Sequence, residues 1–186
     1  MPLNSKQPRV EPLEPPYDDE TAAALDLLGP PIQLFRVLAR RPDLARGISG
    51  WGSYYLSRRA AMTLRHREIV ILRTTALCGA DYEWGIHVTT FGAKAELDEA
   101  QLRSLGAGTA NDPCWREPSD AVVIAAVDAL HHDNELHDAT WSELVEAVGT
   151  DAALEVTLLA GWYHAISYAV RTLRLPLEPG TDAIPR

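Results

Sequence analysis

The chain has 186 residues, enough to form one compact domain with a sizeable core. Hydrophobic residues make up 46% and charged residues 23%, which argues against disorder over most of the length. The net charge of −9 and the lack of a sustained Lys/Arg cluster disfavour a nucleic-acid surface.

Cysteine content and hydropathy indicate the cellular setting. Two cysteines, Cys78 and Cys114, are too few for a disulfide framework and fit a reducing compartment. The N-terminus lacks the apolar core of a signal peptide. The most apolar segment, residues 156–170, is shorter than the roughly 20 residues that span a bilayer. We therefore expect a cytoplasmic protein with no membrane partner.

Proline positions suggest three parts. Five prolines fall in the first 16 residues, which predicts an extended arm over residues 1–17 that either dangles or wraps a neighbouring subunit. A single helical domain is expected over residues 18–176. Residues 177–186, which follow Pro176, form a C-terminal tail.

Boundaries of three helices follow the arm. Asp18 or Asp19 is placed to cap the first helix, which Gly29 and the prolines after it end. Pro31 suits the first turn of the second helix, and Pro42 ends it. A third helix is marked by apolar side chains at spacings of four, three and four: Leu44, Ile48, Trp51 and Tyr55.

Residues 62–77 are expected to form a helix that is buried on most sides. Several apolar residues follow helical spacing. The β-branched content also suits a strand, so periodicity alone does not decide between the two.

Capping signatures mark the later helices: Asp98 with Gln101, Ser119, and Thr140 with Glu143. Three glycines stand at expected helix ends: Gly92, Gly106 and Gly149. The last long helix is expected over about residues 151–173. No alternating strand pattern appears, so we predict an all-α fold of about seven or eight helices in an orthogonal or bundle-like array.

Two glutamates and a histidine lie in the apolar stretch RHREIVILRTTALCGADYEWGIH. Glu83 and His87 are four residues apart, so they share one face of a helix. Glu68 belongs to the preceding helix and approaches that face if the two helices pack together. In the ordinary alternative, Glu83 and His87 form a surface pair, and Glu68 makes a salt bridge to Arg65 or Arg73. The apolar setting favours a site, because buried carboxylates cost several kcal/mol unless they are partnered or protonated.

Three segments resemble the carboxymuconolactone decarboxylase superfamily, which includes alkylhydroperoxidase-type enzymes: REIVILR (67–73), YEWGIH (82–87) and FGAKAELDE (91–99). The specific match covers about residues 65–108. A weaker match in helix order runs from about Pro31 to Leu175 and includes Gly161-Trp162-Tyr163. The resemblance implies an alkylhydroperoxidase-like orthogonal helical array and a homo-oligomer, either a trimer or a hexamer.

In the peroxidase branch of that superfamily, the motif is Cys-x-x-Cys-x-x-x-His with an upstream glutamate. Glu68 and His87 occupy the glutamate and histidine positions, whereas Ala80 and Glu83 replace both cysteines. The ordinary peroxide chemistry needs both thiols, so it is not expected. Cys78 is either a lone reactive thiol or a small buried filler.

The decarboxylase branch carries a glutamate four residues before the histidine, as this chain does at Glu83 and His87. The resemblance therefore implies acid/base catalysis on a small organic acid or lactone, without a cofactor. His87 is expected to deliver a proton to the carbon that loses CO2, while Glu83 holds the substrate. Glu68 relays protons or orients its neighbours.

Other side chains near the motif are candidates for substrate contact. Tyr82 and Trp84 either pack in the core or stack on a flat substrate. His164 is either a core histidine bonded to the backbone or a second pocket wall that faces His87.

Metal binding is not expected at the two places where ligand types gather. His131, His132 and His137 straddle a helix end and a polar loop. Glu83 and His87 offer one copy of a Glu/His pair at a spacing of four, whereas di-iron bundles use repeated pairs at a spacing of three.

Two rival functions remain open from the sequence. One is an antioxidant peroxidase that uses Cys78. The other is a non-catalytic oligomeric binding protein, which would be favoured if Glu83 and His87 pointed into bulk solvent with no cavity beside them.

Overall fold

The computed structural model describes residues 7–186, and all the regular structure in that part of the chain is helical. The all-α prediction is confirmed. Nine α-helices are described, eight of them with seven or more residues. Their bounds are α1 Asp19–Leu28, α2 Gln33–Leu38, α3 Pro42–Tyr55, α4 Leu64–Leu77, α5 Asp81–His87, α6 Glu99–Ala107, α7 Pro118–Asp133, α8 Asp138–Val148 and α9 Thr150–Leu173, with a π-helical turn, η1, at Val88–Gly92. Within residues 7–186, no helix has the length and apolar character needed to cross a bilayer.

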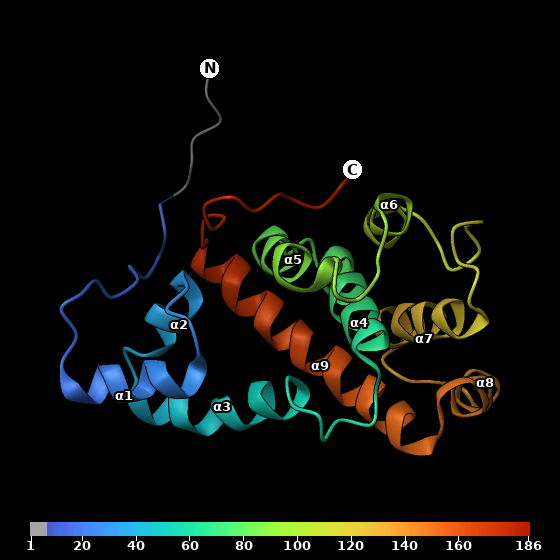
Figure 1. Cartoon of the computed structure of the whole chain (residues 1–186), viewed down its shortest axis with the longest axis horizontal. Coiled ribbons are helices and arrows are strands. Elements are labelled where there is room, and N and C mark those ends of the chain that lie inside the picture. The colour runs from blue at the N-terminus through green and yellow to red at the C-terminus, as the bar shows by residue number, and fades with distance from the viewer. Residues whose placement is uncertain (1–6) are drawn as a thin grey trace.

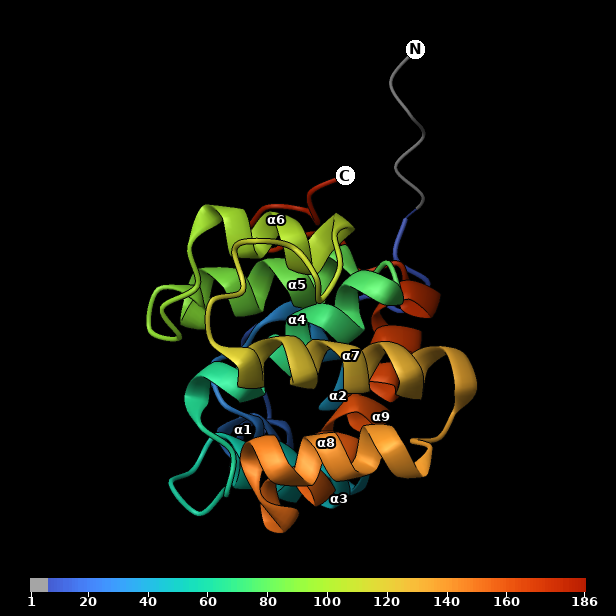
Figure 2. The ribbon, with the colours of Figure 1, turned by 90° about the vertical axis from the view of Figure 1, so that its right-hand side faces the viewer.

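Helix α4 forms the centre of the fold. The Thr63 side chain caps it by accepting a hydrogen bond from the His66 amide at 3.1 Å, which settles the choice between helix and strand. Nine consecutive residues, 67–75, are buried. Helices α5, α6, α7 and α9 all pack against α4 (Figures 1 and 2). A helix covered on every side has no polar face, which is why periodicity could not identify it.

The first three helices form one end of the molecule and contact one another (Figure 1). Asp18 caps α1 by accepting from the Thr21 amide at 2.8 Å, and Gly29, with φ of +114°, ends it. Residues 7–17 of the predicted arm lie against their own chain, since the Arg9 amide donates to the Leu173 carbonyl at 2.9 Å. The part of the arm before residue 7 lies outside the described residues.

Two predicted caps were displaced. Helix α6 has the expected capping box of Asp98 and Gln101, but α7 begins at Pro118, one residue before Ser119. Proline suits the first helical position because its φ is preset and it needs no amide partner. Helix α8 begins at Asp138, so Thr140 lies inside it and does not cap it. An acidic residue in the first turn favours that earlier start.

The C-terminal segment, residues 177–186, packs over α5 (Figure 1). The Tyr82 hydroxyl donates to Glu178 Oε1 at 2.6 Å, and the Ile184 amide donates to Asp81 Oδ1 at 3.1 Å. A Cβ on Gly85 would lie 2.8 Å from the Asp182 carbonyl, so this close approach requires glycine. The last residues are therefore part of the packed domain.

Candidate functional site

A tight turn between α4 and α5 positions the predicted site. Gly79 has φ of +64°, and its amide donates to the Ala76 carbonyl while the Ala80 amide donates to the Thr75 carbonyl. These two bonds form the Schellman motif that ends many helices at glycine. The turn directs α5 back against α4, which brings Glu83 and His87 to the helix that carries Glu68.

Glu68 is fully buried, and both of its carboxylate oxygens have partners. Oε2 lies 2.8 Å from His87 Nδ1. Oε1 accepts from Arg67 Nε at 2.8 Å, and Arg67 Nη1 donates to the Tyr55 carbonyl at 3.0 Å. The alternative salt bridges of Glu68 are wrong, because Asp120 pairs with Arg65 and Asp128 pairs with Arg73: these ion pairs link α4 to α7.

The hydrogen bonds of His87 define its tautomer. A carboxylate can only accept, so Nδ1 carries the proton that is donated to Glu68. The other nitrogen, Nε2, then has a free lone pair and accepts from the Tyr163 hydroxyl at 2.8 Å. Burial raises the pKa of Tyr163 well above its usual value, which keeps that hydroxyl protonated. The three side chains form a carboxylate–imidazole–phenol relay.

Glu83 is the least satisfied member of the site. Its Oε2 lies 4.0 Å from His87 Nε2, beyond hydrogen-bond distance. Its Oε1 is buried and finds no hydrogen-bond partner in the described part of the chain. Burial raises the pKa of Glu83 to about 7, although His87 acts in the opposite direction. A carboxyl group that is partly protonated near neutral pH therefore lies beside the imidazole of His87.

Tyr82 and Trp84 lie elsewhere, although they flank Glu83 in the sequence. The Tyr82 hydroxyl accepts from the Leu34 amide at 2.9 Å and donates to Glu178, so it joins α2 and the C-terminal segment to α5. Trp84 is 2% exposed and belongs to the main hydrophobic core. These placements favour the packing interpretation over substrate stacking.

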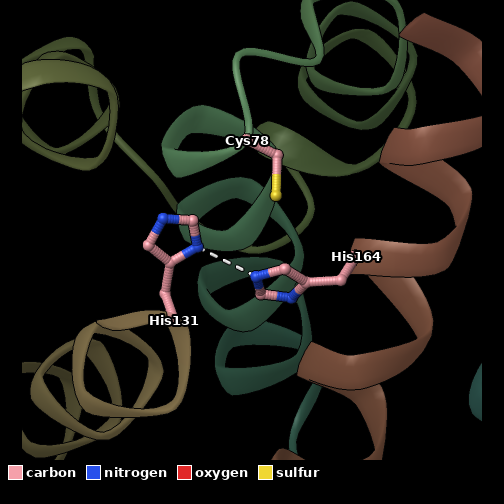
Figure 3. Close-up of side chains that lie close together, drawn as sticks. All are labelled: Cys78, His131 and His164. Carbon is pink, nitrogen blue, oxygen red and sulfur yellow. Dashed lines mark hydrogen bonds between the residues drawn. The ribbon is translucent and has the colours of Figure 1, made fainter. Parts of the chain in front are cut away.

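The hypothesis of a second pocket wall required His164 to face His87, but the ring of His164 faces His131 instead. Its Nδ1 bonds to the Ala160 carbonyl at 2.8 Å, and its Nε2 lies 2.9 Å from His131 Nδ1. The Cys78 thiol is the third member of this group (Figure 3). Burial raises the pKa of that thiol. His131 is close to His132 and His137 in the sequence, but His137 lies beside Glu135 in the structure.

The contacts described above define an acid/base cluster of Arg67, Glu68, Glu83, His87 and Tyr163. Two of its members, Arg67 and Tyr163, were not among the candidate residues. Arg67 is 7% exposed and anchors Glu68, while Tyr163 reaches His87 from α9. Arg67 belongs to the quoted REIVILR segment, and Tyr163 to the Gly161-Trp162-Tyr163 segment of the weaker match. These segments were the only indication in the sequence that Arg67 and Tyr163 are near the site. In neither segment does the residue spacing relate it to His87.

A hollow of about 540 Å³ lies between α3 and α9, apart from the cluster. Trp51, Tyr54 and Leu158 line it, together with Glu155. Glu155 accepts hydrogen bonds from the Tyr54 hydroxyl and from two amides of the segment after α3, at 2.5–3.0 Å. None of the residues that line this hollow is Glu68, Glu83 or His87.

Comparisons of the chain with protein-family models, with curated proteins and with solved structures found no match. The geometry defines an all-α protein with a buried cluster of titratable side chains. The pair of Glu83 and His87 offers an acid and a base within 4.0 Å, and Glu68 orients the base.

Proposed function

We propose that this chain catalyses proton transfer to and from carbon on a small organic acid or lactone, as a carboxymuconolactone decarboxylase-like protein with an alkylhydroperoxidase-like helical array. The unpartnered, buried carboxyl oxygen of Glu83 carries this proposal. Leaving a buried polar atom without a partner costs about 1–3 kcal/mol. A substrate that hydrogen-bonds to Glu83 would offset that cost, and the raised pKa makes Glu83 a proton donor near neutral pH.

The roles that we propose differ from those expected from the sequence. Glu83, rather than His87, is the proton donor, because its pKa lies at about 7. His87 is the base, because its Nε2 has the free lone pair while Glu68 holds its Nδ1. Tyr163 covers that lone pair, so a substrate must displace the Tyr163 hydroxyl to reach it.

The same arrangement supports two related reactions. In a decarboxylation, the bond between carbon and the carboxylate breaks, CO2 leaves, and the electron pair remains on carbon until Glu83 supplies a proton. In an isomerisation, His87 removes a proton from carbon beside a carbonyl and Glu83 returns one to another carbon. The decarboxylation uses the acid of the site, the isomerisation uses both the acid and the base, and neither needs a redox step.

A panel of lactone acids and 3-keto acids tests the proposal, with CO2 release and deuterium incorporation from D2O as readouts. We expect at least one compound to react, and we expect Glu83→Gln to lower kcat about 100-fold. The wild-type rate should fall as the pH rises through about 7, because Glu83 then loses the proton that it donates. Glu143→Gln, on an exposed part of α8, is the matched control.

Two results would contradict this function. If Glu83→Gln reacts as fast as the wild type, Glu83 is not the acid. If the wild type leaves the whole panel unchanged yet binds its members, the binding-protein alternative is favoured.

The rival functions have less support. Cys78 is 8% exposed and burial raises its pKa, which disfavours the thiolate that a peroxidase needs. Cys78 is grouped with the imidazoles of His131 and His164 and not with the second thiol, Cys114. Glu83 and His87 are 5% and 6% exposed, so they do not point into bulk solvent. Exposure to solvent would have favoured the non-catalytic binding protein.

We also propose that the chain assembles into a homo-trimer or homo-hexamer. Apolar side chains at the hollow between α3 and α9 are exposed, with Leu154 at 55% and Leu158 at 45%. A second copy that covered them would remove apolar surface from water. Light scattering should give a mass of three or six chains of 20.4 kDa, and a single-chain mass would contradict the assembly.

A further inference from the structure

A thiol and two imidazoles, none of which belongs to the acid/base cluster, lie together where α4, α7 and α9 meet. Cys78 follows the last residue of α4, His131 is on α7 and His164 is on α9. One potential ligand atom from each side chain lies within 4.8 Å of the others. Figure 3 shows the Cys78 sulfur pointing toward the space between the two rings.

The three elements that carry these residues are held together close to the ligands. Arg171 Nη1, on α9, donates to the Cys78 carbonyl at 2.5 Å. Arg73, on α4, donates to both carboxylate oxygens of Asp128, at 2.6 Å and 3.0 Å. Asp128 lies one turn before His131 on α7. These two contacts fix α9 and α7 to α4, so the thiol and the rings are arranged before any ligand arrives.

The backbone orients His164 as in many metal sites. Its Nδ1 must carry a proton, because the Ala160 carbonyl at 2.8 Å can only accept. Its Nε2 therefore presents a lone pair to the group. A second-shell hydrogen bond of this kind fixes the tautomer of metal-binding histidines. His131 Nδ1 donates to that lone pair at 2.9 Å, and a proton shift to its own Nε2 would free Nδ1 as a ligand.

A second observation at the thiol also points to a ligand. The Ser167 hydroxyl, one turn after His164 on α9 and beside the Cys78 thiol, is fully buried and makes no hydrogen bond of good geometry in the described structure. Buried hydroxyls are normally satisfied. A thiolate bound to a cation is a better hydrogen-bond acceptor than a thiol, so it would give Ser167 a partner.

We propose that Cys78, His131 and His164 bind one Zn²⁺ ion per chain. Zinc takes thiolate sulfur at about 2.3 Å and imidazole nitrogen at about 2.0–2.1 Å, usually in a tetrahedral arrangement. That arrangement separates the two nitrogens by about 3.3 Å, so His131 and His164 need to move apart only slightly from 2.9 Å. Binding expels the thiol proton to solvent and leaves the sulfur as the anionic ligand.

The surrounding charges and exposure agree with a zinc ion that keeps one open position. Asp128 favours a cation near His131, whereas Arg73 and Arg171 oppose it, so the thiolate supplies the main attraction. His131 and His164 are half-buried, and the Tyr168 ring beside His164 is 64% exposed. Solvent therefore reaches this side of the group. Three protein ligands with a fourth position for water are typical of catalytic rather than structural zinc.

Titration of the full chain with Co²⁺, followed by Zn²⁺, tests the site. Tetrahedral Co²⁺ gives visible ligand-field bands, and a bond to thiolate adds a near-ultraviolet charge-transfer band. We expect saturation at one Co²⁺ per chain and loss of both signals when Zn²⁺ displaces it. Cys78→Ser and His131→Gln should each weaken Zn²⁺ binding more than the 10- to 100-fold that outer-shell changes typically cost.

Matched variants separate this site from other thiols, imidazoles and carboxylates. Cys114→Ser and His132→Gln should bind Co²⁺ like the wild type. Glu83→Gln should also keep the full Co²⁺ spectrum, so a failure of the acid/base proposal leaves this result unaffected. The proposal is overturned if the wild type does not saturate at one ion per chain, or if Cys78→Ser keeps the charge-transfer band.

A measurement on the wild type covers the case in which Cys78→Ser fails to fold. X-ray absorption of the zinc complex should then show one sulfur ligand with nitrogen or oxygen completing the shell. A zinc coordination shell without sulfur would contradict the proposed site.

Discussion

Glu68→Gln is expected to lower the free energy of unfolding by about 3–5 kcal/mol, the usual cost of breaking a buried ion pair by removing one partner. Glu68 is fully buried and Arg67 is 7% exposed. The carboxylate neutralises Arg67, with Oε1 accepting from Nε at 2.8 Å, and it also accepts from His87. A glutamine keeps the shape but leaves the Arg67 guanidinium buried without a counter-charge.

Denaturant unfolding at neutral pH measures this effect. The double variant Glu68→Gln/Arg67→Met should recover part of the loss, because it removes the unpaired charge as well. Glu99→Gln is the control: Glu99 pairs with Arg103 on the surface, and such exposed pairs contribute about 0–1 kcal/mol. A loss below about 1 kcal/mol in Glu68→Gln would show that the ion pair is not essential to the fold.

Glu83→Gln is expected to make the protein more stable than the wild type at pH 8, by up to about 3 kcal/mol. The carboxyl ionises near 4.5 in the unfolded chain and at about 7 in the folded chain. Between these values the folded state binds more protons, so the wild-type stability falls as the pH rises from about 4.5 to about 7. Above that range the loss is complete. Glutamine never ionises and avoids it.

Unfolding free energies of both proteins at pH 5, 6, 7 and 8 give the test. The difference between variant and wild type should grow with pH over this range and level off above about 7. If the difference stays constant with pH, burial does not raise the pKa of the Glu83 carboxyl in the folded protein. If both predictions hold, Glu83→Gln lowers the activity and raises the stability. This combination separates a functional role of Glu83 from a structural one.

The sequence allowed prediction of the parts of the site that are close along the chain. The spacing of Glu83 and His87 predicted a shared helical face, and the apolar stretch predicted that Glu68 would approach it. These contacts depend on one turn and two adjacent helices. Tyr163 reaches His87 across 76 positions, and His131 meets His164 across 33. Such contacts depend on how whole helices pack, and no periodicity within one helix specifies them.

The same distinction applies to the helices. Local signals identified the caps at Asp18 and Asp98, where the side-chain hydrogen bonds span three residues. The signal at Thr140 misplaced the start of α8, which has no side-chain cap at all. Asp138 in the first turn favours the observed start of α8. The core segment around Ile71 is buried on every side, so it has no polar face by which periodicity could identify the helix.

The packing of the C-terminal residues over α5 has a practical consequence for handling this protein. Helix α5 carries Glu83 and His87, and it has only seven residues. Its first turn is tied to the chain end through Asp81 and Ile184, and its middle touches that end at Gly85. An affinity tag or a carboxypeptidase acting at Arg186 would disturb the contacts that this segment makes with α5, the helix that carries Glu83 and His87.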